Sequence, residues 1–194
     1  LYARDDSFGN FGTSSIESWS LTIFAQPALP PPDFYYGLNP VSCSGPDYDG
    51  DGRADVAVYR PETGEWFISK SGAAGALEYH AWGAPANAGL DDIAVPADYD
   101  GDGVTDKAVF RRTTGEWFVA NSFLDGTLDH YSFGAASSSN LGDAPVPGDY
   151  DGDGRANAAI YRTTTGQWFV RNLDGSTTTI DWGYPGGGDY PARR

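Results

Sequence analysis

A sequence repeat with a period of 51 residues constrains the fold more than any other feature of this chain. The hexapeptide DYDGDG begins at Asp47 and returns at Asp98 and Asp149, and a TGEW or TGQW tetrapeptide follows each copy at the same interval. Self-similarity at a fixed period is typical of arrays in which each repeat is one supersecondary unit. We therefore predict three like units. They span 47–97, 98–148 and, with a C-terminal tail, 149–194.

Within each unit, the residue pattern predicts β-strands. In the first unit, the segments 55–60, 65–69 and 77–82 are short, rich in aromatic and β-branched residues, and bounded by Gly, Pro, Asn or Asp. The tetrapeptide PETG at 61–64 is typical of a tight turn, so the first two segments are expected to form a hairpin. No window shows a convincing helical period. The sequence thus predicts an all-β fold of three antiparallel repeats, each with three or four strands.

Each unit opens with an acidic loop that has the residue types of a metal site. Asp or Asn stands at positions 1, 3, 5 and 9, and glycines at positions 4 and 6 allow the curl that brings side chains 1, 3 and 5 together. Carboxylates this close repel one another unless a cation relieves the repulsion, and oxygen ligands favour calcium or magnesium over zinc or copper. Calcium is favoured over magnesium because it tolerates many ligands in a flexible arrangement. The predicted side-chain ligands are Asp47, Asp49, Asp51, Asp55, Asp98, Asp100, Asp102, Asp106, Asp149, Asp151, Asp153 and Asn157.

Two other interpretations of the acidic loop have to be weighed. An EF-hand loop starts in the same way but requires Glu at position 12 and flanking helices, whereas position 12 here is Val58, Val109 or Ile160. The alternative that D-G-D-G only builds a turn with side-chain hydrogen bonds stays open.

The third loop has Asn157 at position 9 and therefore one charge fewer, which predicts weaker cation binding there.

The loop resembles the calcium loop of integrin α-subunit propellers, D-x-D-x-D-G-x-x-D between two strands, and the whole unit resembles the FG-GAP or VCBS-type repeats of secreted bacterial β-propeller proteins. This resemblance implies propeller-blade-like units with about three bound calcium ions in all. It also implies that position 7 binds calcium through its backbone carbonyl. The residues at position 7 are Arg53, Val104 and Arg155. Because closed propellers have about four to eight blades, three blades predict a partial or open propeller with two open edges.

The residues before the repeats differ from them in composition. The segment GTSSIESWSLTI at 12–23 resembles the end of the P domain of proprotein convertases and related bacterial proteases. We predict a β-hairpin segment at 1–24, similar to the closing hairpin of that domain. A Pro-rich linker is predicted at 25–46.

Aromatic residues recur in step with the repeat. The tryptophans that precede a Phe in mid-strand are predicted core residues, with sugar stacking as the alternative. They are Trp66, Trp117 and Trp168. The aromatic residues that precede a glycine near the end of each unit are candidates for ligand binding, with packing as the alternative. They are Trp82, Phe133 and Trp182.

Each unit also has an arginine directly after an aromatic residue, at Arg60, Arg111 and Arg162. Two interpretations are open for these arginines: they order the acidic loops through ion pairs, or they lie on the surface.

The composition limits the kinds of partner. With 12 Lys and Arg against 27 Asp and Glu, the formal net charge is −15, which disfavours nucleic acid and anionic membranes. No apolar run approaches the roughly 20 residues of a membrane helix. Cys43 is the only cysteine, so neither an internal disulfide nor a multi-cysteine metal cluster is possible. The chain has no Met and starts at Leu1, which favours a secreted, processed protein.

No nucleophile-base-acid set, phosphate loop or metal-hydrolase motif is visible, so the chain is expected not to be an enzyme. The first functional hypothesis is a secreted, calcium-stabilised β-repeat protein for adhesion, scaffolding or self-assembly. Its partners would be other copies of itself or another extracellular protein, bound through open sheet edges. The alternative is an accessory region of a larger secreted protease or glycan-active enzyme that binds a protein or carbohydrate substrate, as a lectin does.

Overall fold

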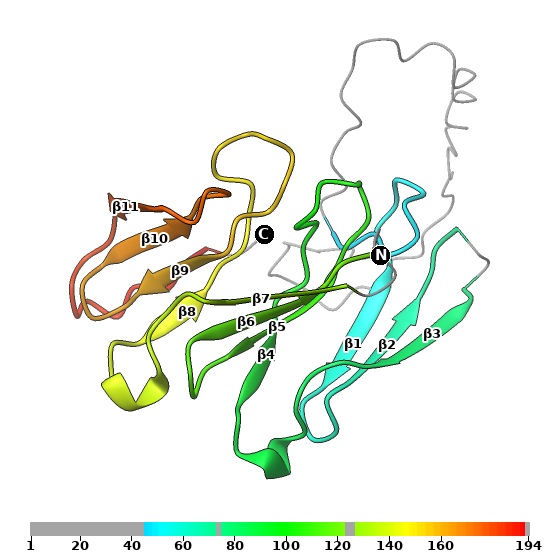
Figure 1. Cartoon of the computed structure of the whole chain (residues 1–194), viewed down its shortest axis with the longest axis horizontal. Helices are drawn as coiled ribbons and strands as arrows, with labels where there is room; N and C mark the ends of the chain where they lie inside the picture. The colour runs from blue at the N-terminus through cyan, green and yellow to red at the C-terminus, as the bar shows by residue number, and fades with distance from the viewer. Residues whose placement is uncertain (1–44, 73–74, 123–126, 193–194) are drawn as a thin grey trace, which may run out of the picture. The chain divides into compact units, whose positions relative to one another are not determined.

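The computed structural model describes residues 45–72, 75–122 and 127–192, which lie within one compact unit, Asn39–Arg194. The predicted hairpin at 1–24 and nearly all of the predicted linker at 25–46 lie outside the described residues. The described part of the chain folds into three antiparallel sheets with two short 3-10 turns and no closed barrel (Figure 1). The predicted all-β fold of three open, blade-like antiparallel sheets is therefore confirmed.

The three sheets contain short strands joined mainly by hairpins. The first sheet has the order β1-β2-β3, with β1 at Val56–Arg60, β2 at Glu65–Ser69 and β3 at Leu77–Ala81. The second has the order β4-β5-β6-β7, with β4 at Asp92–Ala94, β5 at Lys107–Arg111, β6 at Glu116–Ala120 and β7 at Leu128–Ser132. The third has the order β11-β10-β9-β8, with β8 at Asp143–Pro145, β9 at Ala159–Arg162, β10 at Gln167–Arg171 and β11 at Thr177–Asp181. The 3-10 turns are Ala86–Ala88 and Ser137–Ser139.

The two four-stranded sheets each begin one strand before an acidic loop. Strand β4 pairs with β5 across the second acidic loop, with Ile93 opposite Phe110, and β8 pairs with β9 across the third loop, with Ala144 opposite Tyr161. A short first strand is therefore hydrogen-bonded to the strand that follows the loop. This pairing holds the two ends of each acidic loop together.

A buried tryptophan lies at the centre of the second sheet. Trp117 is fully buried, and its Nε1 donates a hydrogen bond of 2.7 Å to the Phe133 carbonyl. The hairpin glycine before it, Gly115, has φ of +76°, and a Cβ there would lie only 2.5 Å from the Gly134 oxygen. Because Gly tolerates both the positive φ and the close approach, the TG pair of the repeat fits this turn. Trp66 repeats the arrangement in the first sheet and is also buried, so both are the core residues that the sequence predicted.

Neighbouring sheets pack face to face. Side chains alternate along each strand, so each sheet has a forward face toward the following sheet and a backward face toward the preceding one. Trp66 and Ile68, on the forward face of the first sheet, pack with Val109 of the second sheet, and Phe118 lies against the same cluster. On the opposite face of the second sheet, Trp117 packs in one cluster with residues of the third sheet. These are Ala158, Ile160 and Phe169.

The acidic loops are linked to one another through their backbones. The Thr105 N–H of the second loop donates to the Asp47 carbonyl of the first, and the Ala156 N–H of the third donates to the Asp98 carbonyl of the second, both at 2.6 Å. The Thr105 hydroxyl also accepts the Asp47 N–H at 2.8 Å. The loops therefore form a continuous row along the three sheets.

The recurrent arginines do not pair with the acidic loops. Arg111 forms a two-bond ion pair with the carboxylate of Asp92 on β4, at 2.8 and 3.0 Å, and stacks over the Phe118 ring. Arg162 pairs in the same way with Asp143 on β8. Neither interpretation of these two arginines is therefore correct, because both fasten the first strand of a sheet to the second. Arg60 is exposed and pairs with Glu65 on its own sheet.

An ion-pair cluster joins the first sheet to the second. Glu78 on β3 contacts Lys70, and its Oε1 lies 3.1 Å from the Lys107 Nζ on β5 and 2.9 Å from the His80 Nε2. Burial raises the pKa of the Glu78 carboxyl, but hydrogen bonds from Lys70 and Lys107 and their charges outweigh burial and lower this pKa to about 2. The ionised carboxylate therefore stabilises the contact between the two sheets.

We expect this cluster to be lost in acid. Because the folded pKa of Glu78 lies below the unfolded value of about 4.3, its stabilisation is complete above that value and disappears as the pH falls toward 2. Glu78→Gln should lower the free energy of unfolding by about 1–2 kcal/mol at pH 7 and less at pH 3. Urea unfolding of the variant and the natural chain between pH 3 and pH 7 measures this difference in the free energy of unfolding. Glu62→Gln, at an exposed turn residue, is the control. A deficit of equal size at both pH values would contradict the assignment.

The described residues contain no helix with the length and apolar character that a membrane crossing requires.

Candidate metal centre in the acidic loops

The acidic loops curl as their glycines predict. In the second loop, the Asp98 carboxylate accepts the N–H of Gly101 at 2.6 Å and that of Gly103 at 2.9 Å. Both glycines have positive φ, +79° and +87°, which a residue with a Cβ adopts only with strain. The first and third loops have the same pair of hydrogen bonds from Gly to the position-1 carboxylate. Position 1 is therefore held at the centre of the curl.

The position-9 side chain closes each loop from the far side. The Asp106 carboxylate is fully buried and accepts the N–H of Tyr99 at 2.8 Å and that of Ser122 at 2.6 Å. Burial raises the pKa of Asp106 to about 6, although these two backbone hydrogen bonds lower it. Asp55 accepts the equivalent pair in the first loop, from Tyr48 and Ser71. The position-9 side chain thus anchors the loop to the hairpin of the same sheet.

The structure brings together most of the predicted side-chain ligands. In the first two loops, carboxylate oxygens of positions 1, 3 and 9 lie within 4.8 Å of one another; the residues are Asp47, Asp49, Asp55, Asp98, Asp100 and Asp106. In the third loop, the group consists of positions 1, 3 and 5, which are Asp149, Asp151 and Asp153. The position-5 residues Asp51 and Asp102 lie outside the first two groups.

Two serines near position 5 were not anticipated from the sequence. The Ser71 hydroxyl donates to the Asp51 carboxylate at 3.1 Å, and the Ser122 hydroxyl donates to Asp102 at 3.0 Å. Both serines follow the second strand of their hairpin, and they are one repeat period apart. Their separation by one repeat period was the sequence signal that could have pointed to a shared role. The third repeat has Leu173 at this position, so it lacks this donor.

The third loop differs from the others at position 9 as well. The Asn157 Oδ1 accepts the Tyr150 N–H at 2.8 Å, as the aspartates do, but its Nδ2 donates to the Asp151 carboxylate at 3.3 Å. An amide donor can hold a carboxylate without a cation. The third loop is also exposed at positions 1, 3 and 5. Its geometry is therefore less dependent on a bound ion.

The position-7 residues donate backbone N–H groups to position 5. Arg53 donates to Asp51, Val104 to Asp102 and Arg155 to Asp153, at 2.9, 2.7 and 2.8 Å respectively. Binding of a cation by their carbonyls remains a prediction. The same side-chain hydrogen bonds are those expected of the turn interpretation.

The donor set nevertheless fits a hard divalent cation. The ligand groups are all oxygens, and in each of the first two loops three carboxylates converge, of which two in the first loop and one in the second are fully or almost fully buried. Converging, buried carboxylates are costly unless a positive charge compensates them. Oxygen-rich sites of flexible geometry are typical of calcium. The clusters are therefore able to hold metal ions.

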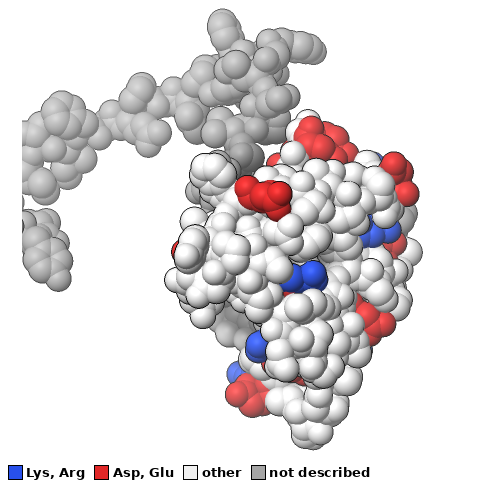
Figure 2. All heavy atoms as spheres, turned by 90° about the vertical axis from the view of Figure 1, so that its left-hand side faces the viewer, with Lys and Arg blue, Asp and Glu red and all other residues white. Residues whose placement is uncertain are grey.

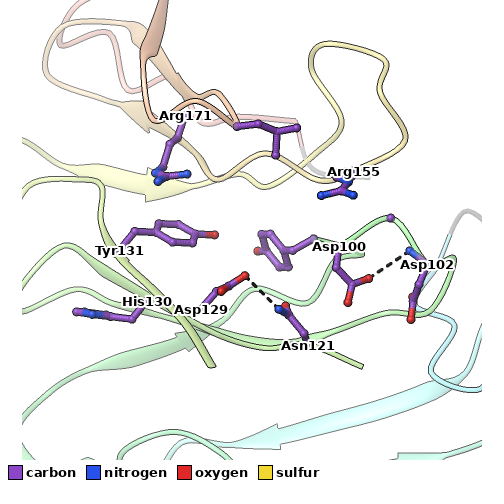
Figure 3. A pocket seen from close by; sticks show the side chains of 11 residues that line it. Asp100, Asp102, Asn121, Asp129, His130, Tyr131, Arg155 and Arg171 are labelled. Carbon is purple, nitrogen blue, oxygen red and sulfur yellow. Dashed lines mark hydrogen bonds between the residues drawn. The ribbon is translucent and has the colours of Figure 1, made fainter. Parts of the chain in front are cut away.

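A polar pocket of about 700 Å³ lies beside the second loop, where the second and third sheets meet. Figure 3 shows Arg155 and Arg171 of the third repeat on one side of this pocket and Asn121 and Asp129 of the second repeat on the other. The Arg171 guanidinium lies over the Tyr131 ring at 4.5 Å. Planar polar groups and an aromatic ring therefore line the same cavity.

The three aromatic residues predicted to bind ligands lie in different environments. Trp82 and Phe133 are partly buried and pack against the clusters between sheets, whereas Trp182 is 78 % exposed. Trp82 also lines a smaller pocket of about 250 Å³ with Val109 and Phe118. Ligand binding by these residues remains a prediction.

Comparison with known proteins agrees with this geometry over part of the chain. The family model of the FG-GAP-like repeat matches residues 47–109. The match covers the first two acidic loops, the first sheet, strand β4 and the beginning of the second sheet's β5. The predicted resemblance to FG-GAP repeats is confirmed for this segment, while the VCBS and P-domain resemblances remain predictions. Neither a curated protein nor a solved structure matches the chain.

Proposed function

We propose that this chain is a secreted, non-catalytic β-repeat protein that is stabilised by calcium and acts in adhesion, scaffolding or self-assembly into an extracellular oligomer or filament. The observation that supports it best is the convergence of positions 1, 3 and 9 in the first two acidic loops. The loops occur in a segment that matches the FG-GAP-like repeat. Calcium at these sites acts on structure, because the second and third loops each join two paired strands of a sheet and neighbouring loops are hydrogen-bonded to one another.

Open sheet edges support a role in interaction. Strands β3, β7 and β11 each pair with one neighbour in the described part of the chain. Unpaired strand edges are templates for pairing with another chain. We propose that other copies of this chain, or another extracellular protein, bind there. The formal net charge of −15 argues against nucleic acid as the partner.

The second candidate function is binding of a protein or carbohydrate substrate as the accessory region of a larger secreted protease or glycan-active enzyme. The observation in its favour is the polar pocket between the second and third sheets, with Tyr131 and Arg171 in its lining. Carboxylates, amides and guanidinium groups beside an aromatic ring are able to hydrogen-bond and stack with sugars. Glycan binding that is lost in Tyr131→Ala would favour this candidate.

Calcium removal is the experiment that tests the first proposal. At a calcium concentration one hundred times its Kd, each occupied site adds about 2.7 kcal/mol to the free energy of unfolding. Addition of EDTA should therefore lower the Tm by several degrees, and calcium should restore it. Magnesium at equal concentration should restore less, because it demands stricter octahedral geometry.

Glu62→Gln, in the exposed turn between β1 and β2 at the opposite end of β1 from the first acidic loop, is the charge control and should respond to calcium as the natural chain does. A Tm that is the same in EDTA and in saturating calcium would refute a stabilising role for the ion.

A further inference from the structure

The two contacts between sheets in this chain are copies of each other. In both, a Trp on the forward face packs on an aliphatic residue of the following sheet: Trp66 on Val109, and Trp117 on Ile160. A Phe of the following sheet's second strand, Phe118 or Phe169, lies against the same cluster in each case. The contact is therefore defined by sequence positions that all three sheets share.

The first sheet exposes the backward half of this contact. Val58 occupies the same position as Val109 and Ile160, but it is 58 % exposed where they are 1 % and 2 % exposed. Val56 and Tyr79, which lie on the same face, are also exposed. No sheet precedes this face in the described part of the chain. An apolar surface that is buried twice within the molecule is thus left open at one end.

The third sheet exposes the forward half. Trp168 is half-buried where Trp66 and Trp117 are fully buried, and it belongs to a cluster made only of third-sheet residues. Tyr150, Ile180 and Trp182 are exposed around it. Figure 2, which views the molecule from the third-sheet side, shows mostly uncharged surface there with a few charged side chains. Exposed apolar patches of this kind mark sites of protein interaction.

We propose that the third sheet of one copy docks its forward face on the backward face of the first sheet of a second copy. The partner is a second copy because the two exposed faces are the two halves of a contact that the chain already makes twice. Trp168 would cover Val58 as Trp117 covers Ile160, and Trp182 would lie near Val58 and Phe67 as Trp82 lies near Val109 and Phe118. This inference rests on the proposed self-association and replaces edge pairing with face packing as its basis.

The charges at the two faces fit this docking. In the first internal contact, Glu78 of the forward face pairs with Lys107 of the backward face. The residues at these two positions on the exposed faces are Thr178 and Val56. The carboxylate and the ammonium are thus both replaced by uncharged side chains. A buried charge without a partner would oppose association. Docking of the two exposed faces buries no such charge at these two positions.

Head-to-tail docking gives either a closed ring or an open chain of copies. Two copies supply six sheets, which is within the four to eight blades of closed propellers. A ring of two copies with two equivalent contacts is therefore the expected assembly.

The experiment measures molar mass by sedimentation of the full chain, from nanomolar to about 100 µM. The natural chain should form a dimer. Val58→Asp damages the backward face and Trp182→Asp damages the forward face, so each variant alone should be monomeric. An equal mixture of the two variants should form a heterodimer, because the intact forward face of one meets the intact backward face of the other. The affinity of this heterodimer should be at least tenfold weaker, because one contact remains of two.

The control is Leu128→Asp, which places the same charge at an exposed aliphatic residue on the edge strand β7, away from both end faces. It should leave the dimer intact. Circular dichroism checks folding, and Val58→Ser substitutes for Val58→Asp where the charged variant misfolds. A monomeric natural chain, a dimer that survives either face variant, loss of the dimer in Leu128→Asp, or failure of the mixture to associate would each overturn the proposal.

The calcium dependence of the Tm is measured on the same variants. A response to calcium that persists in the monomeric variants keeps the stabilising role of calcium separate from docking. A dimer that does not respond to calcium supports the docking and refutes only the proposed calcium function.

Discussion

Trp117→Ala should lower the free energy of unfolding by about 3–5 kcal/mol, as expected when a large buried aromatic side chain is removed. Trp117 is fully buried between the second and third sheets, where it contacts Phe110 at 5.2 Å and Tyr131 at 6.4 Å between ring centroids. The substitution also removes the hydrogen bond to the Phe133 carbonyl. The loss therefore combines a cavity with an unpartnered carbonyl.

Trp168→Ala is the matched control, because Trp168 has the same position in the third sheet and donates the equivalent hydrogen bond to Trp182 at 2.9 Å. It is half-buried, so its loss should be about 1–2 kcal/mol. Urea unfolding in the Val58→Asp background makes the comparison, since this background is expected to prevent docking. Equal losses for the two tryptophans would show that the third sheet's forward face is covered even in the single chain.

The strands of the repeat were predictable from sequence because their signals are local. The segments 55–60 and 65–69 are rich in aromatic and β-branched residues around a turn, and the structure places β1 and β2 within one residue of these bounds. Strands β4 and β8 were not predictable in this way. Each has three residues, which is too few for an alternating pattern. Each is a strand only because it pairs with the strand on the other side of the acidic loop.

In the candidate site too, contacts within one loop were predictable from the sequence, whereas contacts between residues about 20 positions apart were not. The sequence predicted ligands at positions 1, 3, 5 and 9, all within nine residues; the structure brings positions 1, 3 and 9 together in the first two loops and positions 1, 3 and 5 in the third. Ser71 reaches Asp51 from 20 residues away, and the Asp92 partner of Arg111 is 19 residues before it. These contacts depend on strand pairing. Both contacts recur one repeat period later, between Ser122 and Asp102 and between Asp143 and Arg162. The repeat shows that these positions correspond, but it does not show that their side chains are in contact.

Asp106→Ala should remove about 3–5 kcal/mol of stability in calcium, which makes position 9 the most sensitive residue of the acidic loops. The substitution leaves the buried N–H of Tyr99 and the partly buried N–H of Ser122 without an acceptor, at a cost of about 1–3 kcal/mol for the buried one. It also removes one of the three converging carboxylates of the second loop. The stability lost should therefore be larger in calcium than in EDTA.

Asp106→Asn separates these two contributions. The third loop shows that an Asn at this position accepts the N–H of position 2, as Asn157 does from Tyr150. Asp106→Asn should therefore keep most of the stability in EDTA, and it should also relieve the burial of a charge whose pKa is raised to about 6. Its calcium affinity at the second loop should fall about tenfold or more, because a charged ligand is lost. Calorimetric titration and Tm measurement with and without calcium check both effects. If Asp106→Asn kept the full calcium response, the charge at position 9 would have no part in binding, and Asn157 would not mark the third loop as the weaker site.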